Sequence, residues 1–525
     1  MTMTKKLSQT CLSSEDAGER TRILARWKLE VIPATSAKDC LHFFVQSYND
    51  NDVSSDEAAV VSTLLAIIND ELSFTTEGHR ETSLEILHGL LQRAFCQRSI
   101  QENNSSSQEK VIVVLQSLFQ KCSHLFERRM SRLGNSDHRD FHGILMQPIE
   151  QSEHIRLKLV EIMSDLGSYL MLHQEKVKRN PSSSNQYKTA SRGGHTTENA
   201  TVEVKAASRT YQTLAKHVFA DKFPDILMAS CTLVKTLTKL SPEATVQHAT
   251  DLLLQLAGKD VKHCLFRNRR SRIRSEAVET SCAIVLCCEN FEQDDFSISS
   301  MQKVLQSIVL PGWEDLLKMD PSALVRVAVL NAVGMVAGKF SWTCSLTKEH
   351  FDRGCSGNDV VHQSLELAKF VESNLLFLFL LGASDGNVQV TESALNCGIN
   401  DVKGSRVPWN VFSQYFHPVL ELLLASCSLS LSTCKCRVRS LEALQVFLSF
   451  AIATPCLTLQ RIQPIIECLH NNIMSEEKEI LEVRKNPASF MTLSSLFMSF
   501  IQLFSFISNA HLPGGTEGLL HSWWE

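Results

Sequence analysis

Residues 311–338, PGWEDLLKMDPSALVRVAVLNAVGMVAG, have the pattern of two short helices joined by a tight turn. Asp320-Pro321 predicts the end of the first helix, because proline cannot continue a helix and disfavours helical geometry in the residue before it. A second helix is expected from about Ser322, with packing residues at Leu324, Val327, Ala328, Leu330, Val333 and Met335. Because a pair this short cannot bury its own apolar faces, the chain should contain further copies that stack on one another.

Such copies can be recognised by an apolar residue followed by arginine near the start of the second helix, as in Val325-Arg326. The same pair type recurs at Ile155-Arg156, Ile273-Arg274 and Val438-Arg439. Residues 375–398 give a further copy with an Asp385-Gly386 turn. The copies are unevenly spaced, because insertions such as 341–359 interrupt them.

The composition agrees with an array of helices. At 525 residues the chain is too long for one compact core and suits several domains or one extended array. Hydrophobic residues make up 44% of it and glycine only 21 positions, which favours helices over strands with glycine-rich turns. The sequence therefore predicts an all-α fold, an α-solenoid of stacked helix pairs. The net charge of −5 predicts no bulk attraction to nucleic acid or to an anionic membrane.

Apolar residues are distributed unevenly along the chain, and this predicts its domain organisation. Residues 176–208 are rich in Ser, Thr, Asn and Lys, so burial cannot offset the entropy cost of ordering them. We expect a disordered N-terminus at 1–20, a helical block at 21–175, a disordered linker at 176–208, a larger helical block at 209–510 and a tail at 511–525.

The cysteines indicate a reducing compartment. The chain has 17 of them, and many lie within apolar helical patterns, where a thiol behaves as a small buried hydrophobic group. The first residues lack the apolar core that a secretory signal needs. We therefore expect a cytosolic or nuclear protein with free thiols.

The Asp-Pro turn, the Val325-Arg326 pair and the small residues Ala328, Ala332 and Gly334 together resemble a HEAT repeat. This resemblance implies helix pairs of the HEAT or armadillo type, stacked with irregular spacing. It also implies that the function is binding, with the second helices forming the surface that holds a client or a co-assembly factor.

A narrower resemblance covers Phe223–Ala283, where a helix beginning FPD, a leucine-rich helix and a basic turn leading into RIRSEAVE follow one another. This order is similar to the middle region of the HEAT-repeat assembly factor for axonemal dyneins. The segments IRLKLVEIM, LLGASDGNVQV and FHPVLELLL also fall in the order that this family would place them. The resemblance implies a cytoplasmic scaffold for preassembly of the dynein arms of motile cilia or flagella, with dynein chains, chaperones or co-assembly factors as protein partners. It brings no catalytic residue with it.

Two other functions stay open at the level of sequence. A nuclear transport or trafficking adaptor could be built on the same solenoid, and nuclear accumulation that depends on the arginines of 267–274 would favour it. Residues 488–508 carry no charge over about the length needed to cross a bilayer, so a membrane-tethered scaffold is a third possibility. The Ser, Thr and Gln residues of this segment and the lack of a basic flank after it favour a buried helix of the last repeat over a membrane anchor.

The densest charge cluster is a candidate site for a protein partner. It consists of Lys259, Lys262, Arg267, Arg269, Arg270, Arg272 and Arg274. These residues could hold an acidic segment of a partner, act as a nuclear import signal or contact phosphates. Because charge runs are usually exposed faces, a solvated turn between helices is the alternative. Phe266 is the only aromatic residue among them, which argues against nucleic acid.

The recurring arginines have a structural interpretation. Arg156, Arg274, Arg326 and Arg439 occupy one repeat position, which in HEAT stacks commonly bonds to the acidic turn residue of its own or the next repeat. In the reference pair that turn is Asp320-Pro321. A structural role accounts for the recurrence of these arginines without a ligand.

The sequence gives no indication of catalysis, of a cofactor or of a metal. Cys427, Cys434 and Cys436 cluster with His417 upstream, but a zinc site needs paired cysteine spacings and four ligands. A phosphate-binding loop, a dinucleotide-binding glycine motif, a nucleophile elbow and a zinc-protease motif are all missing. We therefore predict a protein that is not an enzyme.

Overall fold

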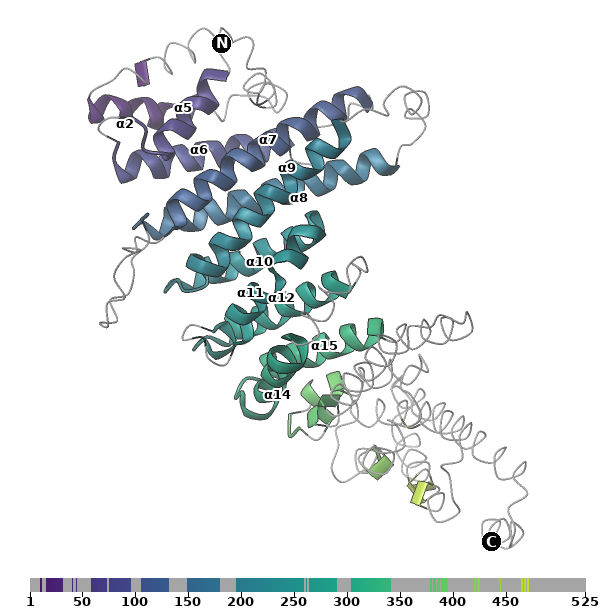
Figure 1. Cartoon of the computed structure of the whole chain (residues 1–525). Coiled ribbons are helices and arrows are strands. Elements are labelled where there is room, and N and C mark those ends of the chain that lie inside the picture. The colour runs from purple at the N-terminus through teal and green to yellow at the C-terminus, as the bar shows by residue number, and fades with distance from the viewer. Residues whose placement is uncertain are drawn as a thin grey trace, which may run out of the picture. The chain divides into compact units, whose positions relative to one another are not determined.

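In this computed structural model, the described parts of the chain are helical and contain no strand. The described residues are 10–11, 16–31, 40, 44, 58–72, 75–95, 105–131, 149–179, 195–258, 261, 264–289, 304–340, 378–379, 381–383, 385–387, 389–394, 420–421, 423–424, 444, 464–465, 467–468 and 470–471. They belong to two compact units, Met1–Val304 and Leu305–Glu525 (Figure 1).

The described helices of the first unit are α2 (Ala17–Arg26), α5 (Ala58–Ile68), α6 (Glu77–Phe95), α7 (Ser105–Met130), α8 (Glu153–Arg179), α9 (His195–Thr213), α10 (Pro224–Leu240), α11 (Pro242–Ala257) and α12 (Ser271–Glu289). Short π-helical or 3₁₀ turns extend or link them at η1 (Trp27–Val31), η3 (Leu214–Val218) and η4 (Leu265–Arg267). The second unit contains η5 (Leu305–Val309), α14 (Leu310–Met319) and α15 (Ala323–Phe340).

Successive helices of the first unit alternate between two layers, as Figure 1 shows. In one layer α6, α8, α10 and α12 pack side by side, and in the other α7, α9 and α11 do the same. Helices also pack across the layers, α5 on α6, α7 on α8 and α11 on α12. This arrangement confirms the prediction of an all-α solenoid of HEAT- or armadillo-like helix pairs.

Local sequence sets where several of these helices begin. Pro224 and Pro242 lie in the first turns of α10 and α11, where the N–H that proline lacks would have no partner within the helix. The Asp16 side chain accepts a hydrogen bond of 2.8 Å from the Gly18 N–H and so caps α2. The helix starts therefore follow from residues that the sequence already displays.

The second unit contains the helix pair expected at 311–338. α14 ends at Met319, and Asp320 adopts the extended geometry that a following proline favours. The prediction that Leu324 and Met335 pack inside is wrong, because Leu324 is 51% exposed and Met335 47% exposed. The buried face instead includes Val325, Val329 and Val336, which are 0% exposed. Almost every position of α15 is apolar, so its pattern defined the helix but not which face is buried.

The structure differs from the expectation of a disordered linker at 176–208. α8 continues to Arg179 and α9 begins at His195, so both ends of the segment are helical and 180–194 lie outside the described residues. Ala206 and Ala207 of α9 are buried, and α9 packs on both α7 and α11. The prediction failed because the described part of α9 before residue 209 buries only small side chains and a glutamate, whereas its large buried side chain, Tyr211, lies beyond the expected linker.

A buried carboxyl group also joins α9 to its neighbours. Glu203 is 8% exposed and accepts hydrogen bonds from Gln116 of α7 at 2.7 Å and from Gln174 of α8 at 3.0 Å. Burial raises the pKa of Glu203, and the hydrogen bonds from Gln116 and Gln174 oppose that rise. These contacts connect the chain across the expected linker.

The domain boundaries consequently change. The compact units divide at Val304 and Leu305, not within 176–208, so blocks at 21–175 and 209–510 do not describe this division. α2 begins at Ala17, inside the expected disordered N-terminus at 1–20. The tail at 511–525 and the apolar segment at 488–508 lie outside the described residues. Within the described residues, none of the helices has the length and apolar character that spanning a membrane requires.

Gly167 on α8 allows α10 to approach closely. A Cβ atom at Gly167 would lie 3.0 Å from Cγ2 of Thr236 and 3.8 Å from Cδ2 of Leu240. We expect Gly167→Leu to lower the free energy of unfolding by about 1–3 kcal/mol, because the added side chain overpacks this helix contact. Urea unfolding of the full chain, followed by far-UV circular dichroism, measures the loss.

Gly78 provides the control for this prediction. No atom lies within 4 Å of a Cβ built at Gly78 on α6. We expect Gly78→Ala to be neutral or stabilising by up to about 1 kcal/mol, since alanine favours the helix. Equal losses in Gly167→Leu and Gly78→Ala would show that the α8–α10 contact is not tight.

Candidate functional site

The turns that precede the second helices share one capping interaction. In each of them, a side-chain oxygen accepts a hydrogen bond from the backbone N–H two residues later. The acceptors and distances are Glu150 (3.2 Å), Asp221 (3.0 Å), Asn268 (3.0 Å), Asp320 (2.9 Å) and Asp385 (2.8 Å). This side chain satisfies a backbone group that the turn would otherwise leave unpaired.

The arginine of each copy binds its own turn. Nη1 of Arg156 donates to the carbonyls of Glu150 and Gln151, both at 2.8 Å. Nη1 of Arg274 donates to the Asn268 carbonyl at 2.7 Å, and Nη1 of Arg326 donates to the Asp320 carbonyl at 2.6 Å. In all three, the accepting carbonyl lies six residues before the arginine. The arginine thus fixes the turn from which its helix starts.

In Arg156 and Arg326, other guanidinium nitrogens reach the acidic residue of the following copy. Nε of Arg156 lies 3.0 Å from Asp221, whose side chain is 7% exposed, and Arg156 itself is 3% exposed. Nε of Arg326 lies 2.7 Å from Asp385. Within each unit, these ion pairs therefore join one helix pair to the next, rather than only to its own turn. Arg439 lies outside the described residues.

Arg80 belongs to the same set, although the sequence reading missed it. Its Nε lies 3.0 Å from Glu150, which is 1% exposed. The residue before Arg80 is His79, not an aliphatic residue, so Arg80 lacks the Val-Arg or Ile-Arg pair that marks the other copies. The signal that could have found it is the spacing to Leu84 and Leu87, which matches the spacing from Arg156 to Val160 and Met163.

In one place along the stack, both the arginine of a copy and the acidic residue of the following turn are replaced by uncharged residues. Leu227 stands six residues after Asp221, where the other copies have arginine, and is 2% exposed. In the following turn, Asn268 replaces the acidic residue. A buried charge without its partner is strongly unfavourable, so a stack that lacks this arginine is stable only if the acidic partner is absent as well.

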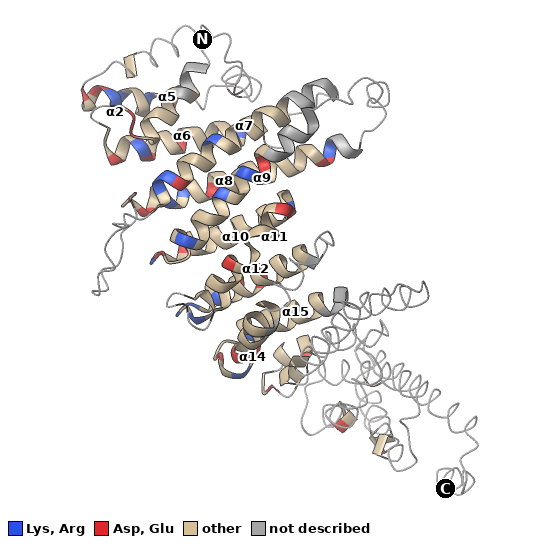
Figure 2. Ribbon diagram, in the orientation of Figure 1, with Lys and Arg blue, Asp and Glu red and all other residues tan. Residues whose placement is uncertain are grey.

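The exposed arginines lie in this same turn. Arg267, Arg269, Arg270 and Arg272 are exposed, whereas Arg274 is 9% exposed. No hydrogen bond or ion pair joins the side chains of Arg269, Arg270 or Arg272 to any residue that the structure describes. Figure 2 shows the basic residues gathered on the turn before α12. Lys259 and Lys262 lie outside the described residues.

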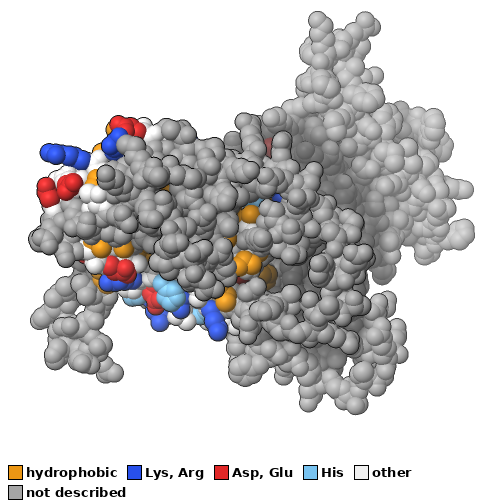
Figure 3. Space-filling model, turned by 90° about the horizontal axis from the view of Figure 1, so that it is seen from above, with side chains coloured by type: hydrophobic (Ala, Val, Ile, Leu, Met, Phe, Trp, Pro, Cys, Tyr) orange, Lys and Arg blue, Asp and Glu red, His pale blue; other side chains and the backbone are white. Residues whose placement is uncertain are grey.

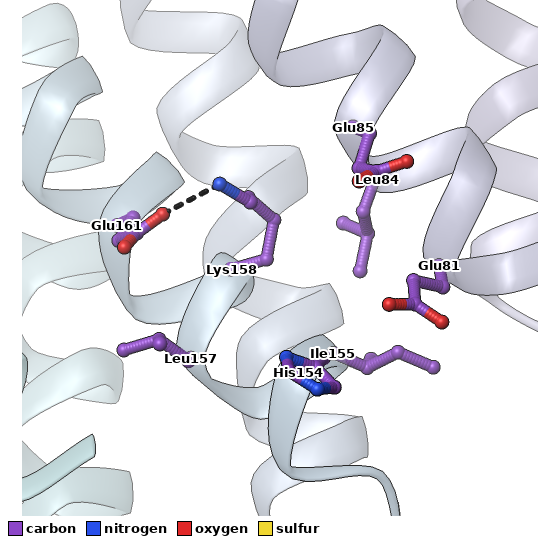
Figure 4. Close-up of a pocket in the computed structure, with 8 residues that line it drawn as sticks. All are labelled: Glu81, Leu84, Glu85, His154, Ile155, Leu157, Lys158 and Glu161. Carbon is purple, nitrogen blue, oxygen red and sulfur yellow. Dashed lines mark hydrogen bonds and ion pairs between the residues drawn. The ribbon is translucent and has the colours of Figure 1, made fainter. Parts of the chain in front are cut away.

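A pocket of about 210 Å³ lies between α6 and α8 (Figure 4). Its lining residues are Glu81, Leu84, Glu85, His154, Ile155, Leu157, Lys158 and Glu161. Lys158 lies 2.7 Å from Glu161, and Glu85 pairs with Lys28. The pocket thus mixes both charges, partly neutralised within the molecule, and its lining offers no Ser or Cys nucleophile.

The exposed face around these helices is mixed in character. Figure 3 shows acidic and basic side chains beside one another where described residues are visible, with apolar side chains in small separate spots. Lys235 of α10 illustrates the pattern, because it pairs with Glu276 at 2.5 Å and with Glu279 at 3.1 Å on α12. The turn before α12 differs, since the side chains of Arg269, Arg270 and Arg272 lack such partners in the described chain.

The buried thiols are poorly suited to covalent chemistry. Burial raises the pKa of Cys122, Cys231 and Cys282 to about 12 each, so these groups stay protonated at neutral pH. The residues that the structure describes include no group of three or more His, Cys, Asp or Glu side chains that could hold a metal ion. Cys427, Cys434, Cys436 and His417 lie outside that part.

Comparisons with known proteins leave the family open. No protein-family model matches the chain, and no curated protein gives a significant match. Among solved structures, an engineered protein is similar at 10% identity with a TM-score of 0.37, over 96% of this chain and 99% of its own. Kap95p, studied with RanGDP, is similar at 12% identity with a TM-score of 0.42, over 99% of this chain and 62% of its own. Kap121p bound to RanGTP is similar at 11% identity with a TM-score of 0.33, and the chain covers 50% of it. At these scores the fold rests on the helix packing itself.

Proposed function

We propose that this protein is a non-catalytic scaffold that binds other proteins through the exposed residues of its helix stack. The observation that carries the proposal is the separation of its arginines into two sets. Arg80 and Arg156 form ion pairs inside the helix stack. The side chains of Arg269, Arg270 and Arg272 are exposed, and the hydrogen bonds of the turn use only the backbone of Arg269 and Arg270. The exposed set is therefore available to a partner.

Within this class, we propose cytoplasmic preassembly of axonemal dynein arms, with dynein chains, chaperones or co-assembly factors as partners. The resemblance over 223–283 supports this function. That segment contains α10, α11 and the first two-thirds or so of α12, and so includes the exposed arginines.

An affinity pull-down from the soluble fraction of flagellated cells, read by mass spectrometry, tests the proposal. We expect dynein heavy or intermediate chains together with chaperones. A purification of the same chain from cells without flagella is the control for proteins that bind any exposed helical surface. Absence of dynein chains from the flagellated sample would contradict dynein-arm assembly but not the scaffold class.

A nuclear transport or trafficking adaptor is the second candidate, because the exposed arginines would also suit an import signal. The same pull-down separates the two functions. Recovery of import cargo or a Ran-type GTPase without dynein would favour the adaptor. Extraction of the protein only by detergent would instead favour a membrane-tethered scaffold.

A further inference from the structure

The turn before α12 carries an excess of positive charge. Residues 258–275 contain five arginines and two lysines but only one acidic residue, Asp260. In the other capped turns an acidic side chain occupies the capping position, whereas here Asn268 does. The nearest acidic residues along α12, Glu276 and Glu279, are already paired with Lys235. Among the described residues of its own repeat, no acidic side chain therefore pairs with Arg269, Arg270 or Arg272.

A second basic residue lies at the same edge of the stack. Lys235 of α10 pairs with Glu276 of α12, and Sγ of Cys287 lies 3.5 Å from the Thr238 carbonyl, so the two helices run side by side in the same direction. Their starting turns are then neighbours, separated by about 8–10 Å, the usual spacing of packed helices. Lys222, in the turn before α10, is exposed. It extends the basic surface beyond the arginines of the next turn.

From this arrangement we infer that Lys222, Arg269, Arg270 and Arg272 form a docking surface for an acidic, extended segment of a partner protein. The positive end of the α12 dipole adds to the attraction for carboxylates. Arginine suits such a partner because its planar fork binds a carboxylate through two hydrogen bonds. Phe266 is 5% exposed, so the turn before α12 offers no aromatic ring on which a nucleic acid base could stack. The exposed ring of Phe223, next to Lys222, already lies against the Arg156 guanidinium.

This inference rests on the proposed scaffold function and specifies the partner chemistry of one surface. Direct binding to the purified full chain tests it, using the fluorescence anisotropy of a labelled peptide of about 12 residues rich in Asp and Glu. We expect saturable binding that weakens severalfold as sodium chloride rises from about 50 to about 200 mM, because salt screens exposed charges. The triple variant Arg269→Glu, Arg270→Glu, Arg272→Glu should lose about tenfold or more in affinity.

A charge-matched variant controls for net charge. Arg22, Lys205 and Lys239 are exposed elsewhere on the first unit, and their replacement by glutamate changes the charge by the same amount. We expect this control to keep most of the affinity, and both variants to keep the circular dichroism of the parent chain. Equal affinities of the two variants would overturn the assignment of the surface. Tighter binding of a single-stranded oligonucleotide of equal charge, lost in the arginine variant, would overturn the assignment of the partner.

The outcome is separable from that of the pull-down. Peptide binding without recovery of dynein would contradict the function in dynein-arm assembly but support the docking surface. Recovery of dynein without peptide binding would leave the assembly function and place its contact elsewhere.

Discussion

Arg156→Ala should lower the free energy of unfolding of the first unit by about 3–5 kcal/mol, because it removes one partner of a buried ion pair. Asp221 would keep a negative charge in a site where it is 7% exposed. The carbonyls of Glu150 and Gln151 would also lose their donor. The guanidinium further lies 5.3 Å from the centre of the Phe223 ring, a contact that adds to the loss. Urea unfolding of the full chain, followed by far-UV circular dichroism, gives the free energy.

An exposed pair provides the matched control. Arg26 and Glu30 lie 2.8 Å apart on the surface, with side chains 43% and 64% exposed. Arg26→Ala should cost less than about 1 kcal/mol, because water screens such a pair. Adding Asp221→Asn to Arg156→Ala should cost less than the sum of the single losses, since the uncompensated charge disappears. A loss below about 1 kcal/mol for Arg156→Ala would contradict its role in joining the repeats.

Acidification should destabilise the protein through His173 by about 3 kcal/mol at pH 4. His173 on α8 is 1% exposed, and neither ring nitrogen has a hydrogen-bond partner among the residues that the structure describes. Burial, assisted by the charge of Lys176, lowers the pKa of His173 to about 4. Its pKa in the unfolded chain is about 6.5, so between pH 6.5 and pH 4 the unfolded chain takes up a proton that the folded chain does not. The stability is present above about pH 6.5 and is lost as the pH falls.

His173→Leu isolates this contribution. The variant should show a smaller fall in the free energy of unfolding between pH 7 and pH 4 than the parent chain, by about 3 kcal/mol. His154 of the same helix is exposed, and His154→Gln provides the control for replacing a histidine there. Free energies from urea unfolding at each pH measure both variants. Identical slopes for the parent chain and His173→Leu would show that His173 gains a partner when it is protonated.

The features that the sequence predicted are those that depend on local pattern. The end of α14 at Met319 follows from Asp320-Pro321, whose effect on backbone geometry is confined to adjacent residues. The arginines at 156 and 326 could be found because a repeated position has a repeated sequence. Their expected partner was an acidic residue of the same or the next repeat. The choice of Asp221 and Asp385 in the next turn required the packing of one helix pair on another.

The failures share a physical cause. The part of α9 within 176–208 was missed because its described buried side chains are two alanines and Glu203, and Glu203 is held by Gln116 and Gln174 on other helices. The buried face of α15 was misassigned at Leu324 and Met335, because a helix that is apolar all round does not reveal its orientation. Arg80 was missed because His79 precedes it in place of an aliphatic residue, and its ion pair with Glu150, 70 residues away in the chain, forms only when the helices pack.

By itself, the sequence determined that this chain folds into stacked helix pairs and where several turns and arginines fall, since helix formation and proline breaks act within a few residues. Only the tertiary structure decided which of the arginines are used internally. Arg156 lies against Asp221 because neighbouring helices place them together, whereas Arg269, Arg270 and Arg272 remain exposed next to a turn whose equivalent charges are absent. Burial depends on what packs against a residue, and residues close in sequence share a local pattern without sharing those neighbours.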